Sequence, residues 1–129
     1  ADGVADQSFI ELAGGASEGY IFTDSFDSHN PTTKLSKDFI ANYEKTKGTK
    51  EVPNFTAMGA DAYFVMFNAL NACVDNLTPI CVNEKIHQTT NFEGVSGIIS
   101  IDETGNATRS VVLKEIKNQK QVFKDIINP

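Results

Sequence analysis

Few residues in this chain are of the types that carry chemistry, and they are scattered along it. The two histidines, His29 and His87, stand in a polar loop and in a helical stretch, without the carboxylate or Cys spacing of a metal site or a catalytic dyad. The serines lack the G-x-S-x-G surroundings of an acyl-transfer nucleophile. We therefore expect a protein that is not an enzyme, with no catalytic residue, metal site or cofactor.

The two cysteines, Cys73 and Cys81, are separated by seven residues that suit a turn between two helices. Such a turn could bring the thiols into bridging range, and a disulfide there would imply an oxidising compartment. The alternative is two buried thiols at the ends of the two helices. Both interpretations stay open at this point.

Three other patterns have simple explanations. Residues 102–106 superficially look like part of a calcium loop, but they lack the twelve-residue ligand pattern, and a hairpin turn is the better account. Asn54, Asn76 and Asn106 each begin an N-x-T triplet, which often arises by chance. Four lysines near the C-terminus are expected on a solvated strand and turn face: Lys114, Lys117, Lys120 and Lys124.

The composition limits the classes of partner. The 129 residues are the length of one domain, and the net charge of −6 argues against a nucleic-acid surface. The longest apolar stretch, residues 62–72, is far too short to span a membrane. No export signal opens the chain, so we expect that any such signal has been removed or lies upstream, and that the chain is cut from a longer protein.

Helical patterns fill the first two thirds of the chain. Asp6 can cap a short helix, and a five-residue strand follows at residues 19–23. Apolar periodicity predicts three more helices, over residues 31–47, over residues 54–74 and from residue 78 to about residue 90. The second of these has an apolar face wide enough to be buried in the middle of a layer.

The sheet is predicted near the C-terminus. After a turn at Gly94, apolar residues alternate through residues 95–101, and a turn sends the chain back into residues 110–116. A last strand is expected at residues 121–126. The fold class is therefore α/β, with helices packed on a small mixed sheet that has a C-terminal β-hairpin.

Four segments together resemble a known family. They are Asp2-Gly3 with residues 9–23, the F-I-A-N-Y-E of residues 39–44, the F-T-A-M-G-A-D-A of residues 55–62, and the F-E-G-V-S-G through D-E-T-G-N of residues 92–106. In this order they resemble the C-terminal third of type I periplasmic binding proteins, the Leu/Ile/Val-binding branch of ABC-transporter substrate-binding proteins. The resemblance covers essentially the whole chain.

The resemblance implies a partial type I fold, in which residues 1–129 are a C-terminal fragment of a two-lobed protein. Residues 1–23 and 92–129 would supply second-lobe and hinge portions, and residues 24–91 a helical first-lobe portion. The implied function is the exported, periplasmic solute-binding component of an ABC importer. It would capture a branched-chain or other amino acid, or an amide, by lobe closure and deliver it to a membrane permease. A ligand-sensing domain of a receptor or of an amide-responsive regulator is the alternative.

The missing two thirds would leave sheet edges and apolar faces exposed. We therefore expect the fragment alone not to bind ligand. We also expect a homodimer, strand exchange between copies or a rearranged fold. A fragment that binds nothing and has only a structural role is the remaining possibility.

The resemblance also assigns site residues. Asp2 would accept the ligand's ammonium group, the alternative being a terminal residue without a partner. Phe55 would line the ligand side-chain pocket, the alternative being a core residue at a helix start. The expected hinge residues are Tyr20, Thr23, Phe92 and Gly94. For Tyr20 and Thr23, the alternative is ordinary packing within a strand.

Overall fold

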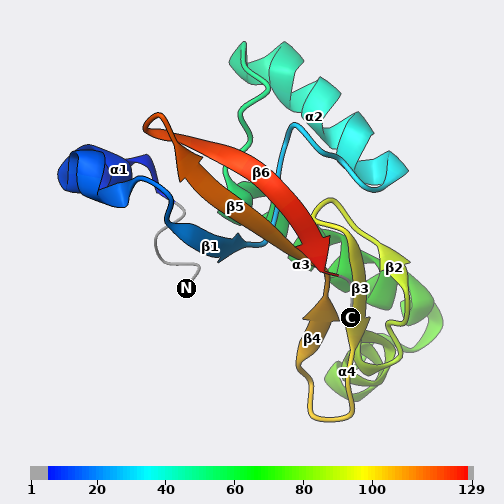
Figure 1. Ribbon diagram of the computed structural model, residues 1–129. Coiled ribbons are helices and arrows are strands. Elements are labelled where there is room, and N and C mark those ends of the chain that lie inside the picture. Colours follow the sequence, from blue (N-terminus) through cyan, green and yellow to red (C-terminus); the bar gives the residue numbers. More distant parts are fainter. Residues whose placement is uncertain (1–5, 128–129) are drawn as a thin grey trace.

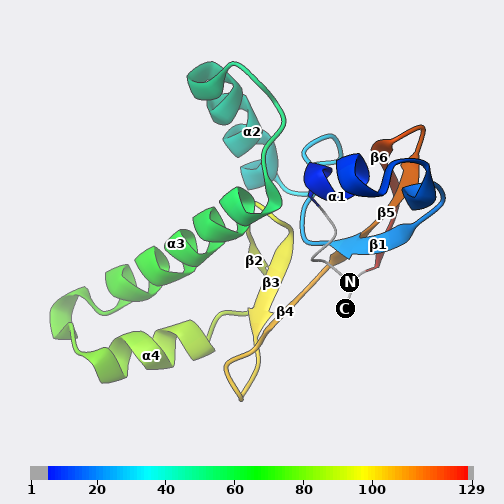
Figure 2. The ribbon, with the colours of Figure 1, turned by 90° about the vertical axis from the view of Figure 1, so that its left-hand side faces the viewer.

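The computed structural model describes residues 6–127 and arranges them in two small bodies (Figure 1). The sheet body contains α1 (Gln7–Ala13), η2 (Gly14–Ser17), β1 (Ile21–Asp24), β5 (Val111–Lys117) and β6 (Lys120–Ile127). The helical body contains α2 (Lys34–Lys47), α3 (Asn54–Ala72), η3 (Val74–Asn76), α4 (Pro79–His87), β2 (Phe92–Glu93), β3 (Ile98–Ile101) and β4 (Ala107–Arg109). The two bodies lie side by side, and the chain passes between them after β1 and again between β4 and β5 (Figure 2).

The sheet body is built around β5, which lies between β1 and β6 and is antiparallel to both. Alternate residues of the strands point toward α1 and form a small core. Phe22 of β1 and Ile116 of β5 pack there against Ile10 of α1, and all three are almost fully buried. The predicted last strand is confirmed as β6, which is joined to β5 by a turn at Asn118 and Gln119.

The helical body has a separate core, to which α2, α3 and the segment after β2 contribute. Its buried members are Phe26, Ile40, Val52, Ala57 and Val95. The sequence predicted α2 from residue 31, but the helix begins at Lys34. The Thr33 side chain accepts a hydrogen bond from the Ser36 amide at 2.9 Å and caps the helix at that point.

The strand pairing differs from the predicted hairpin. β3 turns back at residues 102–106 and pairs with β4, with Ile101 opposite Ala107. The cause is a tight turn in which the Asp102 carboxylate accepts the Asn106 amide at 2.9 Å, so the chain returns earlier than predicted. β5, the predicted return strand, pairs in the other sheet, and two antiparallel sheets replace the single mixed sheet. Residues 92–109 therefore pair within the helical body.

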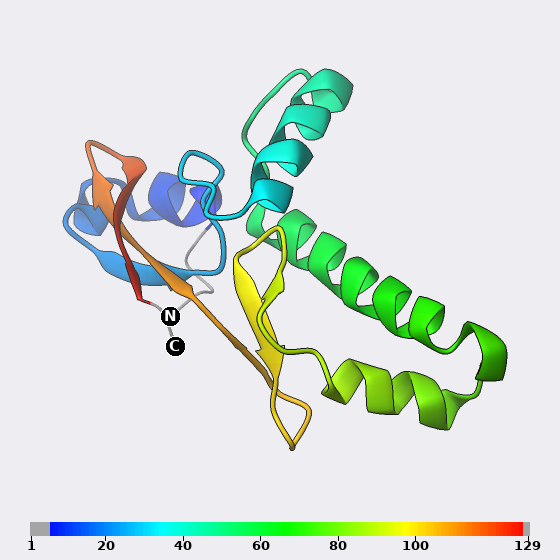
Figure 3. The same cartoon turned by 90° about the vertical axis from the view of Figure 1, so that its right-hand side faces the viewer.

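Within the helical body, α3 and α4 form an arm that extends away from α2 and from the sheet body (Figure 3). A disulfide between Cys73 and Cys81 joins the two helices where the chain turns, so the first of the two alternatives for the cysteines is confirmed. Much of the apolar face predicted for α3 lies open: Tyr63 is 61% exposed and Met66 is 45% exposed. Within residues 6–127, no helix is both long enough and apolar enough to cross a membrane.

Candidate functional site

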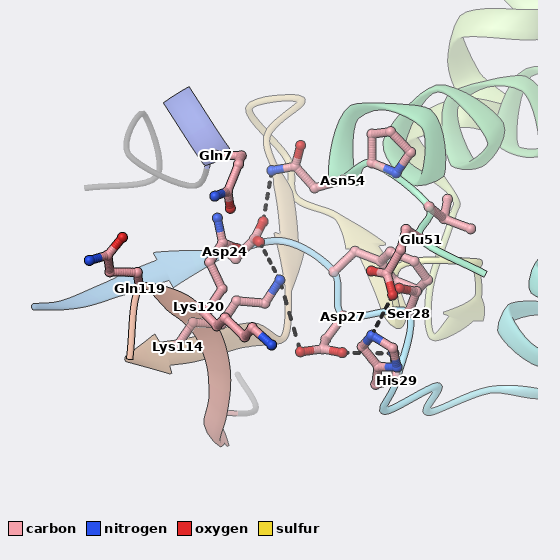
Figure 4. A pocket seen from close by; sticks show the side chains of 14 residues that line it. Gln7, Asp24, Asp27, Ser28, His29, Glu51, Asn54, Lys114, Gln119 and Lys120 are labelled. Atoms are coloured by element: carbon pink, nitrogen blue, oxygen red, sulfur yellow. Dashed lines mark hydrogen bonds and ion pairs between the residues drawn. The ribbon is translucent and has the colours of Figure 1, made fainter. Parts of the chain in front are cut away.

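A pocket of about 630 Å³ lies at the junction of the two bodies (Figure 4). We call it the junction pocket. Its walls come from the start of α1, the end of β1, the residues that lead into α3, and the strands β5 and β6. Its polar side chains, several of them charged, belong to Gln7, Asp24, Asp27, Ser28, His29, Glu51, Asn54, Lys114, Gln119, Lys120 and Gln121.

Asp24 is the best-connected residue of the junction pocket. It ends β1, is only 4% exposed, and lies where the chain leaves the sheet body. One carboxylate oxygen accepts a hydrogen bond from the Asn54 amide group at 2.7 Å, and the other accepts one from the Lys114 ammonium at 2.8 Å. A carboxylate buried this deeply needs such partners, because an unpaired buried charge is costly.

Lys114 does not lie on a solvated face, and that prediction is wrong. Its side chain is 13% exposed, because β5 points it toward α1 and the end of β1 on the same side of the sheet as Val112 and Ile116. Besides its ion pair with Asp24, its ammonium lies 3.9 Å from the Asp27 carboxylate. The ammonium therefore compensates two buried carboxylates at once.

A second contact links the two crossings of the chain. The guanidinium of Arg109, at the end of β4, donates a hydrogen bond to the Ser25 hydroxyl at 2.9 Å. Arg109 is the only arginine of the sequence, and Ser25 directly follows β1. The passage from β1 and the passage to β5 are thus tied together.

The rim of the junction pocket is more open than its floor. His29 and Glu51 form an exposed pair at 2.9 Å between the imidazole Nε2 and a carboxylate oxygen. Lys120, at the start of β6, is exposed and points its ammonium into the pocket region (Figure 4). Exposed pairs of this kind contribute little to stability and stay free to exchange partners.

The chemistry of the junction pocket is that of polar binding. Amide, carboxylate and ammonium groups can donate and accept hydrogen bonds with a small polar solute. Among residues 6–127, no group of three or more His, Cys, Asp or Glu side chains is placed to hold a metal ion.

Each of the two expected ligand residues lies close in sequence to a residue that lines the junction pocket. Asp2 lies outside the described residues, five positions before Gln7 at the rim. Phe55 follows Asn54 at the start of α3, and its side chain is 78% exposed. The core alternative for Phe55 therefore does not hold within this chain, and its ring is free to meet a ligand or another part of a larger protein.

The expected hinge residues divide between the two bodies. Tyr20 and Thr23 lie in the sheet body, where the Tyr20 ring stacks on Phe22 with centroids 6.5 Å apart. Phe92 and Gly94 lie in the helical body, where Phe92 belongs to β2 and Gly94 directly follows that strand.

Gly94 is fixed by a neighbouring helix. A side chain at this position would place its Cβ 2.5 Å from a carboxylate oxygen of Asp61. Asp61, on α3, accepts hydrogen bonds from the amides of Val95 and of Ser96, the latter at 2.9 Å. The hydroxyl of Thr33, the N-cap of α2, donates to the Gly94 carbonyl at 2.6 Å. The Gly94 turn is therefore hydrogen-bonded both to the start of α2 and to α3.

The sequence reasoning missed Asp24, Asn54, Lys114 and Arg109 as a cluster. One signal was present, since two carboxylates three positions apart, Asp24 and Asp27, stand at the end of a predicted strand. That pattern does not indicate which distant side chains meet the two carboxylates.

Comparison with known proteins found similarity among solved structures alone. No family model and no curated protein sequence matches the chain. A leucine-binding protein LivK from Thermotoga maritima is 36% identical, with a TM-score of 0.84 over 95% of this chain and 35% of its own. The branched-chain amino acid substrate-binding protein LivJ from Streptococcus pneumoniae, in complex with isoleucine, is 21% identical, with a TM-score of 0.76 over 96% of this chain and 35% of its own. A solute-binding protein of an ABC transporter from Rhodopseudomonas palustris, in complex with benzoate, is 20% identical, with a TM-score of 0.71 over all of this chain and 34% of its own.

This chain therefore spans about a third of the length of the structures that it matches.

Proposed function

We propose that this chain, which is part of a type I periplasmic-binding-protein fold, supplies the hinge of the solute-binding component of an ABC importer. The observation that carries the proposal is the 36% identity and TM-score of 0.84 with a leucine-binding protein over nearly the whole chain. A branched-chain amino acid is the ligand class that we propose first, because leucine and isoleucine are named for two of the similar structures. Benzoate in a third makes a small aromatic acid the competing ligand.

The arrangement of the two bodies supports capture by lobe closure. Each body has its own hydrophobic core, and along the chain only three residues, Thr23-Asp24-Ser25, lie between Phe22 of one core and Phe26 of the other. A boundary of polar contacts can rearrange at lower cost than an interdigitated apolar core. The boundary between the bodies therefore suits a hinge.

The ligand contacts in this proposal are Asp2 and Phe55. Asp2 would accept the ammonium group of an amino acid, and Phe55 would cover part of its side chain. Their proximity in sequence to Gln7 and Asn54 supports a ligand site that opens toward the junction pocket. The 129 residues alone would bind weakly at best, since they span about a third of the similar structures.

The implied partner is a membrane permease, and the implied location is the periplasm. The disulfide between Cys73 and Cys81 supports an oxidising compartment. Homodimer formation or strand exchange stays a prediction: every described strand pairs within the chain, and light scattering would test it.

Calorimetric titration tests the proposal on the longest natural chain that contains this sequence. Leucine, isoleucine, valine and benzoate would each be titrated, and at least one is expected to bind with one ligand per chain. Phe55→Ala should weaken that binding by about tenfold, the effect of removing a buried aromatic contact worth about 1.4 kcal/mol. Phe67→Ala, on the same helix and 46% exposed, is the matched control and should leave binding unchanged. Absence of binding by all four compounds would overturn the ligand class.

A further inference from the structure

We propose that two hydrogen bonds between the bodies, Asn54 to Asp24 and Arg109 to Ser25, form a latch that sets the angle of the hinge. The inference rests on the proposed function only for the use of that angle in ligand capture. The latch itself acts in the chain without ligand.

The two partners of the first bond belong to different bodies. Asp24 moves with the sheet body because its backbone pairs with Val112 of β5. Asn54 is the first residue of α3 and moves with the helical body. Its hydrogen bond to the Asp24 carboxylate, 2.7 Å long, therefore joins the two bodies directly.

The second latch contact joins the two crossings. Arg109 lies on β4, which pairs with β3 in the helical body. Ser25 is the first residue beyond β1, and it accepts the guanidinium at 2.9 Å. A rotation of the helical body that leaves Ser25 with β1 lengthens or redirects this bond as well as the bond from Asn54.

Lys114 provides the internal contrast. It pairs with the same Asp24 carboxylate at 2.8 Å, but it lies on β5, in the same sheet as Asp24. A rotation between the bodies leaves this ion pair intact. Asp24 thus has one partner that is fixed with respect to it and one that the hinge can move.

Because the two acceptors are buried, the latch contacts favour one relative orientation of the two bodies. Asp24 is 4% exposed and Ser25 is 8% exposed, so water cannot readily replace the partner that either one loses. Other orientations of the bodies leave a buried acceptor short of a donor. Each latch bond removed should raise the population of such orientations by about fivefold, the Boltzmann factor of a typical net hydrogen bond.

Residual dipolar couplings of backbone amides test the latch on the 129-residue chain without ligand. The alignment of each body is fitted separately, and the ratio of the two degrees of order reports motion between them. We expect a ratio near one for the unchanged chain. Asn54→Ala and Arg109→Gln should each lower the ratio, and together they should lower it further.

Lys124→Met is the matched control, because the ion pair of Lys124 with Glu115, 3.0 Å long, joins β6 to β5 within the sheet body. It should leave the two bodies with one common alignment. Unequal alignment in the unchanged chain, or equal alignment in both latch variants, would overturn the proposal. Because no ligand takes part, these outcomes are independent of whether a branched-chain amino acid binds.

Discussion

Replacement of Asp61 is predicted to be among the most destabilising single changes in the helical body. Asp61 is 4% exposed on α3, and its two carboxylate oxygens accept the amides of Val95 and Ser96. Asp61→Ala removes both acceptors at once. The two amides lie in a buried turn, and in the unchanged chain the Asp61 side chain holds that turn against α3.

The magnitude follows from the two amides. A buried donor left without an acceptor costs about 1–3 kcal/mol, so Asp61→Ala should lower the free energy of unfolding by about 2–6 kcal/mol. The whole free energy of unfolding of a domain is about 5–15 kcal/mol, so Asp61→Ala should remove a large share of it. Asp61→Asn keeps one acceptor oxygen and should lose about half as much, about 1–3 kcal/mol.

Urea unfolding followed by circular dichroism measures these losses, since the chain has no tryptophan to report by fluorescence. The control is Asp38→Asn on α2, whose side chain is 54% exposed and pairs with Lys34 four residues before it. An exposed pair of this kind contributes about 0.2–1 kcal/mol. If Asp61→Ala were no more destabilising than Asp38→Asn, the reasoning about the buried amides would be refuted.

Three further predictions concern other parts of the chain. Replacing both cysteines by serine should cost about 2.5 kcal/mol in the chain-entropy model, and addition of reductant to the unchanged chain should cost the same in urea unfolding. Hydrogen bonds from Lys124 and then Lys117 lower the pKa of Glu115 below its ordinary value of 4.5. This contribution is complete above pH 4.5 and is lost as the pH falls through the lower folded-state pKa, so the stability difference between Glu115→Gln and the unchanged chain should vanish in acid. Gly94→Ala should destabilise the chain by about 1–3 kcal/mol, because the added Cβ overlaps the Asp61 carboxylate. Gly59→Ala, at an open position in a helix, should stabilise it by about 0.5–1 kcal/mol. Equal effects of the two changes in thermal melts would contradict the contact at Gly94.

Local patterns predicted the helices well. Apolar periodicity and caps placed α2, α3 and α4 to within a few residues. The turn-rich spacing of Cys73 and Cys81 left the bridge as one of two alternatives, and the structure has the bridge. These features depend on residues that are close in sequence. The ordered resemblance of four segments supplied the fold, which periodicity alone could not have specified.

Contacts between distant segments were not predictable in the same way. Lys114 looked solvated because its partner Asp24 lies 90 positions earlier in the chain. The pairing of β5 with β1 likewise depends on a contact across most of the sequence, whereas the expected partner was simply the preceding strand. Local patterning places alternate residues on one face of a strand but does not identify the neighbouring strand.

The most direct measurement of the central claim is small-angle scattering combined with calorimetric titration, on the longest natural chain that carries this sequence. We expect that one of leucine, isoleucine, valine or benzoate binds and that the radius of gyration decreases on binding, as the bodies rotate about residues 24–25. Binding without any decrease, or no binding by these compounds, would contradict capture by closure at this hinge.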